Sequence, residues 1–225
     1  IIPTPGSVME TTLILNDLIK GVMTIDVGGA TTDVLSVCEP NQIYQKYHDG
    51  EPLFKRTVEG DLGVYINRKL VFEQTKKSRL NQVLHKDDEY LSKLIENEPY
   101  IPKTKEGKQL IDLLTETCVE KALDRHVGDL KRVFTTNGMK VIPDGKDTTQ
   151  VQAMFLTGGA CLYHENIEPF IRSYLEQAVT KLVPHHQVKI FKDEQYLFSS
   201  LGVLSLTYKH EVKELLKKMF DLKEG

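Results

Sequence analysis

The segment 21–37, GVMTIDVGGATTDVLSV, constrains the fold of this chain more than any other part of the sequence. An apolar run from Val22 to Val27 stops at a pair of glycines, and a second apolar run begins at Thr32. Apolar runs bounded by glycine are typical of strands, and a connection this short joins neighbouring antiparallel strands. The segment therefore predicts a buried hairpin with a glycine-threonine turn.

The composition is that of an ordinary globular protein. The 225 residues include 40% hydrophobic and 27% charged residues, enough for one large or two small domains with a sizeable core. A net charge of -3 provides no broad basic field, so we expect no nucleic-acid or anionic membrane partner. No apolar run approaches the length that spans a bilayer.

The three cysteines, Cys38, Cys118 and Cys161, lie far apart in the sequence. Their spacing predicts neither a zinc site nor a disulfide framework, and a reducing cytoplasmic location follows as the expectation. Because the sequence begins with Ile1 rather than methionine, we expect either a piece of a longer protein or the loss of a disordered start.

The hydrophobic pattern predicts an α/β fold in two parts. Residues 1–74 and 131–225 are expected to form an α/β lobe, and the charged segment 75–130 a mainly helical insertion. A strand within 152–160 is expected to stop at Thr157. Further strands are expected over 43–48, 53–58 and 187–191, and helices over 7–18, 61–74, 87–97, 105–127, 167–182 and 201–220.

The first glycine turn has the residue types of a phosphate-binding loop. Gly28 and Gly29 allow backbone N–H groups to approach an anion closely, and Thr31 and Thr32 add hydroxyl donors. Asp26 would repel a bare phosphate, so a cation is needed between them, and Mg²⁺ prefers such oxygen ligands. The alternative is a plain hairpin turn that binds nothing.

A second strand ends in the same way, at Thr157-Gly158-Gly159-Ala160, with a helix expected next. Its glycines would allow the backbone to lie against an adenine ring or an α-phosphate. The alternative is a tight strand-to-helix connection without a ligand.

These two turns, in this order, resemble the superfamily of acetate and sugar kinases, heat-shock chaperones and actin (ASKHA), whose members clasp ATP between two related lobes. IDVGGATTDV resembles its second phosphate motif, LTGGA its adenosine motif, and SSLGVLSL (199–206) its second connecting helix. The joint order of PTPGSV, DVGGATTDV, VEGDLG, RHVG, GKDTTQV and LTGGA resembles the glutamate mutase L component family, MutL or GlmL.

The resemblance implies a fold, cofactors and site residues. The fold would be a ribonuclease H-like actin/ASKHA lobe, a mixed sheet flanked by helices, with an inserted helical subdomain. ATP and Mg²⁺ would be bound, with Asp26 holding the metal through water and Asp33 either orienting water or capping the turn. The residues expected to contact nucleotide are Gly28, Gly29, Ala30, Thr31, Thr32, Gly60, Asp61, Gly63, Thr157, Gly158, Gly159 and Ala160.

Asp61 and His126 have competing interpretations. Asp61 is equally explained as the N-cap of the expected helix 61–74. His126 is interpreted mainly as a surface residue or a partner of a helix dipole, with a catalytic base as the minor alternative.

The resemblance covers only the C-terminal lobe, because no second aspartate- and glycine-rich hairpin precedes Asp26. The leading expectation is the ATP-binding lobe of an accessory, reactivating ATPase for an adenosylcobalamin-dependent mutase. The partners would be a mutase subunit and the missing N-terminal lobe. With half of the clasp absent, weak nucleotide binding and little turnover are expected. The alternatives are a small-molecule kinase or hydantoinase-type ATP-coupled enzyme, and a non-enzymatic interaction module with a vestigial site.

Overall fold

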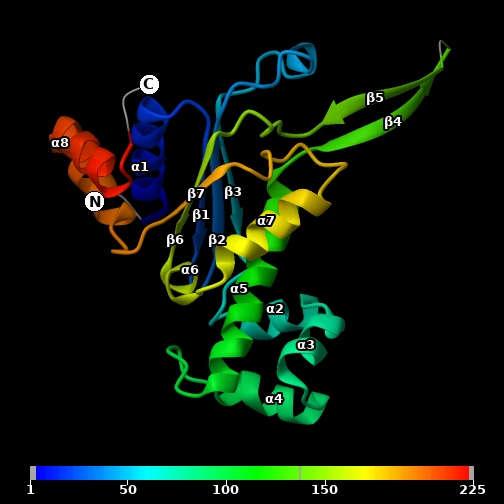
Figure 1. The fold of residues 1–225 in the computed structure, drawn as a ribbon, viewed down its shortest axis with the longest axis vertical. Coiled ribbons are helices and arrows are strands. Elements are labelled where there is room, and N and C mark those ends of the chain that lie inside the picture. Colours follow the sequence, from blue (N-terminus) through cyan, green and yellow to red (C-terminus); the bar gives the residue numbers. More distant parts are fainter. Residues whose placement is uncertain (1–3, 137, 223–225) are drawn as a thin grey trace.

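The computed structural model describes residues 4–136 and 138–222, which form a five-stranded mixed sheet with helices on both faces (Figure 1). The strands follow the order β3-β2-β1-β6-β7. β2 is antiparallel to β1 and β3, whereas β6 is parallel to β1 and to β7. The strands are β1 (Val22–Val27), β2 (Thr32–Val37), β3 (Phe54–Glu59), β6 (Ala153–Thr157) and β7 (Lys189–Lys192).

Alternation along β1 divides the core into two layers. Met23, Ile25 and Val27 pack under α5 (Lys105–His126) and α7 (Ile167–Gln177). Val22 packs on the opposite face, under α1 (Thr4–Leu18) and α8 (Phe198–Met219). Both layers are visible in Figure 1. The expected fold class, a mixed sheet flanked by helices, is confirmed, including the hairpin of β1 and β2.

The helices α1 and α8 pack closely because Gly202 has no side chain. A β-carbon on Gly202 would lie 1.7 Å from the carbonyl oxygen of Ser7. The sequence motif SSLGVLSL therefore brings two helices together, with Ser7 Oγ and Ser199 Oγ also 2.8 Å apart. The first residue of the PTPGSV segment, Pro3, lies outside the described residues.

Three short helices extend the molecule below the sheet (Figure 1). Their apolar side chains join the same hydrophobic cluster as α5 and the sheet. The division of the chain into an α/β lobe and a helical insertion stays a prediction. These helices are α2 (Arg68–Gln74), α3 (Lys77–Leu84) and α4 (Asp88–Asn97).

A two-stranded arm, β4 (Asp129–Thr135) and β5 (Gly138–Asp144), projects from the opposite end (Figure 1). Its base is held by backbone hydrogen bonds, including one of 2.7 Å from Leu130 N to the carbonyl oxygen of Thr180. Near its tip, Phe134 is 88% exposed. The arm is therefore anchored at its base and surrounded by solvent at its tip.

Three expected elements are wrong in whole or in part. The helix expected over 167–182 ends at Gln177, because Lys181 and Leu182 pair with the backbone at the base of the β4–β5 arm. The segment 43–48 leaves the sheet and forms only a 3₁₀ turn, η1 (Gln45–Tyr47), because the side chain of Ile43 finds no core and is 75% exposed. The helix expected over 61–74 begins only at Arg68, because the backbone N–H groups of residues 64–66 donate to the carbonyl oxygens of Gly28 and Gly29 instead.

His126 is also corrected, because it is buried rather than exposed. Its Nε2 lies 2.8 Å from Ser36 Oγ and its Nδ1 lies 2.8 Å from Thr57 Oγ1. Burial, followed by the positive charges of Lys146 and Lys55, lowers the pKa of His126 to about 3. This neutral imidazole holds α5 against β2 and β3.

The thiols of Cys38, Cys118 and Cys161 are buried and form no disulfide. Burial raises the pKa of the Cys38 thiol to about 11 and that of Cys118 to about 12, so both stay protonated at neutral pH. No helix within residues 4–136 and 138–222 is long and apolar enough to cross a membrane.

Candidate functional site

The two glycine turns meet at one edge of the sheet. Because β1 and β6 are parallel neighbours, their carboxyl ends lie together, and Asp26 is paired in register with Thr157. Gly158 follows at once with a φ of +91°, and a β-carbon there would lie 2.3 Å from the carbonyl oxygen of Val27. Only glycine permits this close approach, which brings the second turn against the first.

The first turn is a closed hairpin loop with unused amide groups. Gly28 N donates to the carbonyl oxygen of Thr31 at 2.9 Å, so the Gly28 N–H is already occupied. The backbone N–H groups of Gly29, Ala30 and Thr31 donate to no residue in the described part of the chain. Three successive free amides at a turn are suited to an anion.

The segment VEGDLG supports this turn from behind. A β-carbon on Gly63 would lie 2.4 Å from the carbonyl oxygen of Ala30, so the two backbones touch. Tyr65 N donates to the carbonyl oxygen of Gly29 at 2.9 Å, and Asn67 Nδ2 donates to that of Ala30 at 2.8 Å. These bonds fix the turn and explain why a helix cannot start at residue 61.

Asp26 is the carboxylate whose protonation is most perturbed at this edge. Burial, followed by the negative charges of Asp33 and Asp193, raises its pKa to about 6. No described residue donates a hydrogen bond to its carboxylate, and no cation pairs with it. A cation beside Asp26 would therefore remove an unfavourable charge.

Asp33, the second expected catalytic residue, forms an ion pair with Arg56. It is 4% exposed, and its Oδ1 accepts hydrogen bonds from Arg56 Nε at 3.1 Å and Arg56 Nη2 at 2.7 Å. Its carboxylate is shielded from solvent, and Arg56 on β3 reaches it across the sheet. Sequence spacing does not reveal this pairing between strands.

The expected hydroxyl donors divide into two groups. Thr31 stays at the turn, with its hydroxyl 3.4 Å from Asp33 Oδ2. Thr32 is buried and donates to the carbonyl oxygen of Leu62 at 2.6 Å. Thr157 is also buried and donates to Asp193 Oδ2 at 2.9 Å. Thr32 and Thr157 therefore stabilise the protein from within rather than presenting donors at the edge.

Asp193 was not anticipated from the sequence. Besides Thr157, its carboxylate accepts hydrogen bonds from Leu197 N at 2.9 Å and Phe198 N at 3.0 Å. It thereby starts α8 at Phe198, and it places a buried negative charge near Asp26. An aspartate shortly before an apolar helix is the only signal that favoured such a capping role.

The remaining candidates are Asp61, Gly60, Gly159 and Ala160. Asp61 pairs with Arg125, with Nη1 at 2.7 Å from Oδ1 and Nη2 at 2.9 Å from Oδ2. The hydrogen bonds from Arg125 lower the pKa of Asp61. The N-cap interpretation of Asp61 is therefore wrong. Gly60 has open space around its α-carbon, and Gly159 and Ala160 begin the short helix α6 (Gly159–Tyr163).

Three tyrosines near this edge were missed. The ring of Tyr65 meets that of Tyr100 edge-on, with centroids 5.1 Å apart. Burial, followed by the negative charges of Asp26, Tyr100 and Asp193, raises the pKa of Tyr196. Their positions depend on contacts between distant segments, and no local pattern indicates them.

The edge suits a hydrated magnesium ion better than a metal held by protein alone. Among residues 4–136 and 138–222, no three His, Cys, Asp or Glu side chains converge as a metal site. Mg²⁺ commonly keeps several waters and takes one or two carboxylates together with phosphate oxygens. Asp26 alone, beside the free amides of the first turn, fits that pattern.

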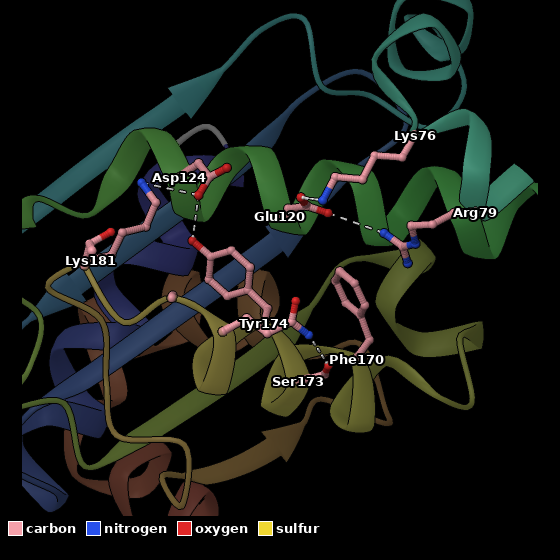
Figure 2. A pocket seen from close by; sticks show the side chains of 11 residues that line it. Lys76, Arg79, Glu120, Asp124, Phe170, Ser173, Tyr174 and Lys181 are labelled. Atoms are coloured by element: carbon pink, nitrogen blue, oxygen red, sulfur yellow. Dashed lines mark hydrogen bonds and ion pairs between the residues drawn. The ribbon is translucent and has the colours of Figure 1, made fainter.

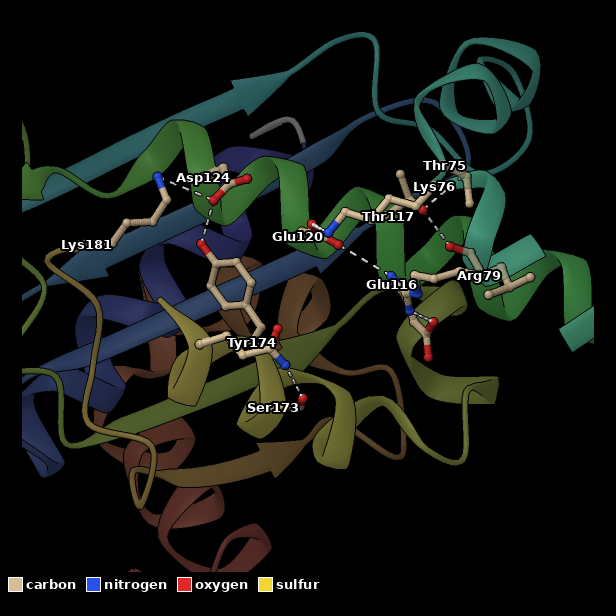
Figure 3. A network of polar contacts seen from close by, with 12 residues as sticks. Thr75, Lys76, Arg79, Glu116, Thr117, Glu120, Asp124, Ser173, Tyr174 and Lys181 are labelled. Atoms are coloured by element: carbon tan, nitrogen blue, oxygen red, sulfur yellow. Dashed lines mark hydrogen bonds and ion pairs between the residues drawn. The ribbon is translucent and has the colours of Figure 1, made fainter. Parts of the chain in front are cut away.

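A separate pocket of about 480 Å³ lies between α5 and α7, beside the start of α3 (Figure 2). A network of polar side chains lines this pocket (Figure 3). Lys76 Nζ is 2.7 Å from Glu120 Oε1, and Tyr174 Oη donates to Asp124 Oδ1 at 2.9 Å. Arg79 pairs with Glu116 and Glu120. Its charged side chains are satisfied by one another, so this network explains how α3 and α7 are joined to α5.

Comparisons with known proteins agree with the motif series. The curated protein MutL of Clostridium tetanomorphum is 28% identical over 233 residues, covering 97% of this chain and 50% of that protein. The chain thus spans about half the length of the curated relative it matches.

Two solved structures are similar at low identity. An archaeal actin homologue has a TM-score of 0.43 and 13% identity, covering 92% of this chain and 55% of the other. Component A of (R)-2-hydroxyglutaryl-CoA dehydratase from Acidaminococcus fermentans has a TM-score of 0.41 and 14% identity, covering 90% of this chain and 68% of the other.

The family described as MutL protein matches residues 1–220, which is nearly the whole sequence. The chain therefore belongs to the MutL protein family.

Proposed function

We propose that this chain is the nucleotide-binding half of an ATP-driven, chaperone-like accessory protein that serves an adenosylcobalamin-dependent mutase. The observation that carries the proposal is the meeting of two glycine turns, from distant parts of the sequence, beside the unpaired Asp26. A plain hairpin turn would not need a second glycine turn against it or an uncompensated carboxylate next to it.

The polyphosphate would bind at the first turn. The free N–H groups of Gly29, Ala30 and Thr31 are donors for phosphate oxygens, and Gly63 and Asn67 hold that turn in place. The nucleoside would lie toward Gly158, Gly159 and Ala160. Gly28, Thr32 and Thr157 then act by shaping the two turns rather than by touching the ligand.

Mg²⁺ would supply the positive charge between the phosphates and Asp26. Asp26 would orient one water of the hydrated ion, and the ion would favour the ionised carboxylate, whose pKa is raised to about 6 in its absence. Asp33 forms an ion pair with Arg56 and would not contact the ligand. Its carboxylate still adds to the negative potential at Asp26.

Turnover would depend on the rest of the protein. The chain corresponds to about half of its curated relative. Phosphoryl transfer is accelerated by groups arranged on all sides of the transferring phosphate, so this half alone would bind weakly and hydrolyse slowly. A nucleotide held between two lobes favours their closure, and closure would bias a bound mutase between two states.

The mutase partner is the part of the proposal that rests on the motif series alone, from PTPGSV to LTGGA, which resembles the glutamate mutase L component. The small-molecule kinase remains the competing activity. It differs from the accessory role in its product, because only a kinase releases a phosphorylated metabolite.

The test is isothermal titration of Mg-ATP into the intact protein, followed by ATPase assays with and without an adenosylcobalamin-dependent mutase. Asp26→Asn should weaken Mg-ATP binding strongly and remove its dependence on Mg²⁺. The matched control is Asp17→Asn in the last turn of α1, where Asp17 pairs with Lys209 on the surface.

Hydrolysis that rises on addition of the mutase would support the accessory role. A phosphorylated small molecule as the product would indicate the kinase instead. If the intact protein bound no Mg-ATP and the Asp26→Asn variant behaved like the parent, the chain would be an interaction module with a vestigial site.

A further inference from the structure

Residues 98–104 form a strap between α4 and α5 whose two ends are fixed. Glu98 is buried, and its carbonyl oxygen accepts a hydrogen bond of 2.5 Å from Arg68 Nη1. Its carboxylate accepts one of 3.2 Å from Lys103 N. The strap thus closes on itself at its base, and Tyr100 and Ile101 form its exposed tip.

The tip of the strap reaches both glycine turns. A β-carbon on Gly29 would lie 3.2 Å from Tyr100 Cε2, and one on Gly159 would lie 4.0 Å from Tyr100 Oη. A single tyrosine ring therefore touches the first turn and lies beside the second. Any ligand that contacts both turns must enter the space that this ring occupies.

The ring is held there by weak contacts. Its main neighbour is Tyr65, met edge-on. Tyr100 is 58% exposed, and no residue in 4–136 or 138–222 forms a hydrogen bond with its hydroxyl. The two prolines that flank the tip, Pro99 and Pro102, limit the backbone conformations of the strap and leave the ring as its movable part.

We propose that Tyr100 controls access to the nucleotide site, because its ring lies between Gly29 and Gly159 and must be displaced when Mg-ATP binds. This inference rests on the proposed function. Displacing one edge-on aromatic contact reduces affinity by about three- to tenfold. The fixed ends of the strap return the ring to the gap when the nucleotide leaves.

The experiment measures Mg-ATP binding to the intact protein and to three variants. Tyr100→Ala should lower the dissociation constant about three- to tenfold, because no ring has to be displaced. Tyr100→Phe should match the parent, because the hydroxyl makes no hydrogen bond. Tyr47→Ala is the control, since Tyr47 lies in η1 and is 43% exposed.

Movement of the ring has its own readout. These 225 residues contain no tryptophan, so the difference in emission between Tyr100→Trp and the parent reports on the tip of the strap. Saturating Mg-ATP should shift its emission to longer wavelength as the ring moves into water. Tyr47→Trp should show no shift.

The outcomes separate this inference from the proposed function. If the parent binds Mg-ATP but Tyr100→Ala binds equally or less tightly, the access role of Tyr100 is overturned and the nucleotide site stands. If only Tyr100→Ala binds measurably, the inference is supported in its strongest form. If neither protein binds Mg-ATP, both proposals are overturned.

Discussion

Asp26 and Asp33 face each other across the β1–β2 hairpin, yet only Asp33 has a cation. Arg56 neutralises Asp33, whereas Asp26 is left with a pKa raised to about 6 by burial and by its acidic neighbours. A chain selected for stability alone would not keep an unpaired carboxylate in this position. This asymmetry is why a bound cation at Asp26 is the centre of the proposed site.

The first prediction concerns Asp26 and pH. Its pKa in the folded protein is raised from the ordinary 3.8 of an aspartate to about 6, so its contribution to stability is complete below pH 3.8 and is lost as the pH rises through about 6. Asp26→Asn should therefore raise the free energy of unfolding at pH 7 by about 1–3 kcal/mol without ligand. Urea unfolding from pH 4 to pH 8 measures this, and an Asn variant less stable than the parent at pH 7 would contradict it.

The second prediction compares two adjacent glycines. Gly158→Ala forces a β-carbon against the carbonyl of Val27 at a φ of +91° and should cost about 2–4 kcal/mol of stability. Gly159→Ala meets no atom closer than 4.0 Å, so its stability should change by less than about 1 kcal/mol. Its affinity for Mg-ATP should nevertheless fall several-fold. Equal thermal stability of the two variants would refute the close approach of the turns.

The third prediction concerns Arg56. Arg56→Met leaves the buried Asp33 without a partner and should cost about 2–4 kcal/mol. The double variant Arg56→Met with Asp33→Asn should recover most of that loss, because no charge is then stranded. Chemical unfolding of the four proteins in a double-mutant cycle measures the coupling, and additive effects would show that the pair does not interact.

The fourth prediction concerns acid. The pKa of His126 is lowered to about 3 in the folded protein, below the ordinary 6.5 of a histidine. Its contribution to stability is therefore present above pH 6.5 and is lost as the pH falls toward 3. His126→Gln, which stays uncharged, should lower the free energy of unfolding at pH 7. Between pH 6 and pH 4, the free energy of unfolding of this variant should fall less steeply than that of the parent. An unchanged slope would mean that other groups govern acid unfolding.

Much of the fold could be predicted from local patterns. The β1–β2 hairpin, the strand ending at Thr157 and the long helix α5 all follow from apolar runs, glycines and helical spacing. The expected strand over 43–48 failed because alternation alone does not show whether a core face exists to receive it. The expected helix start at Asp61 failed because the backbone there bonds to the glycine turn instead.

The candidate site was also only partly predictable from the sequence. The residue types of the turns were enough to predict which segments gather at the edge, but not which groups stay free there. The sequence does not distinguish Thr32 and Thr157 from Thr31. Only the structure shows that the hydroxyls of Thr32 and Thr157 donate to buried acceptors within the protein. Arg56, Asp193 and the 98–104 strap depend on contacts between distant segments, which a single sequence does not reveal.

The pairing of β1 with β6 also determines when, during synthesis, the two glycine turns come together. The first turn can close as soon as its hairpin is made, but the second arrives only after the whole of α5 and the β4–β5 arm have been synthesised. Such non-local pairing is slow to form. During synthesis on the ribosome, the nascent chain must therefore emerge past Gly159 before the proposed nucleotide could bind between the two turns and stabilise the fold.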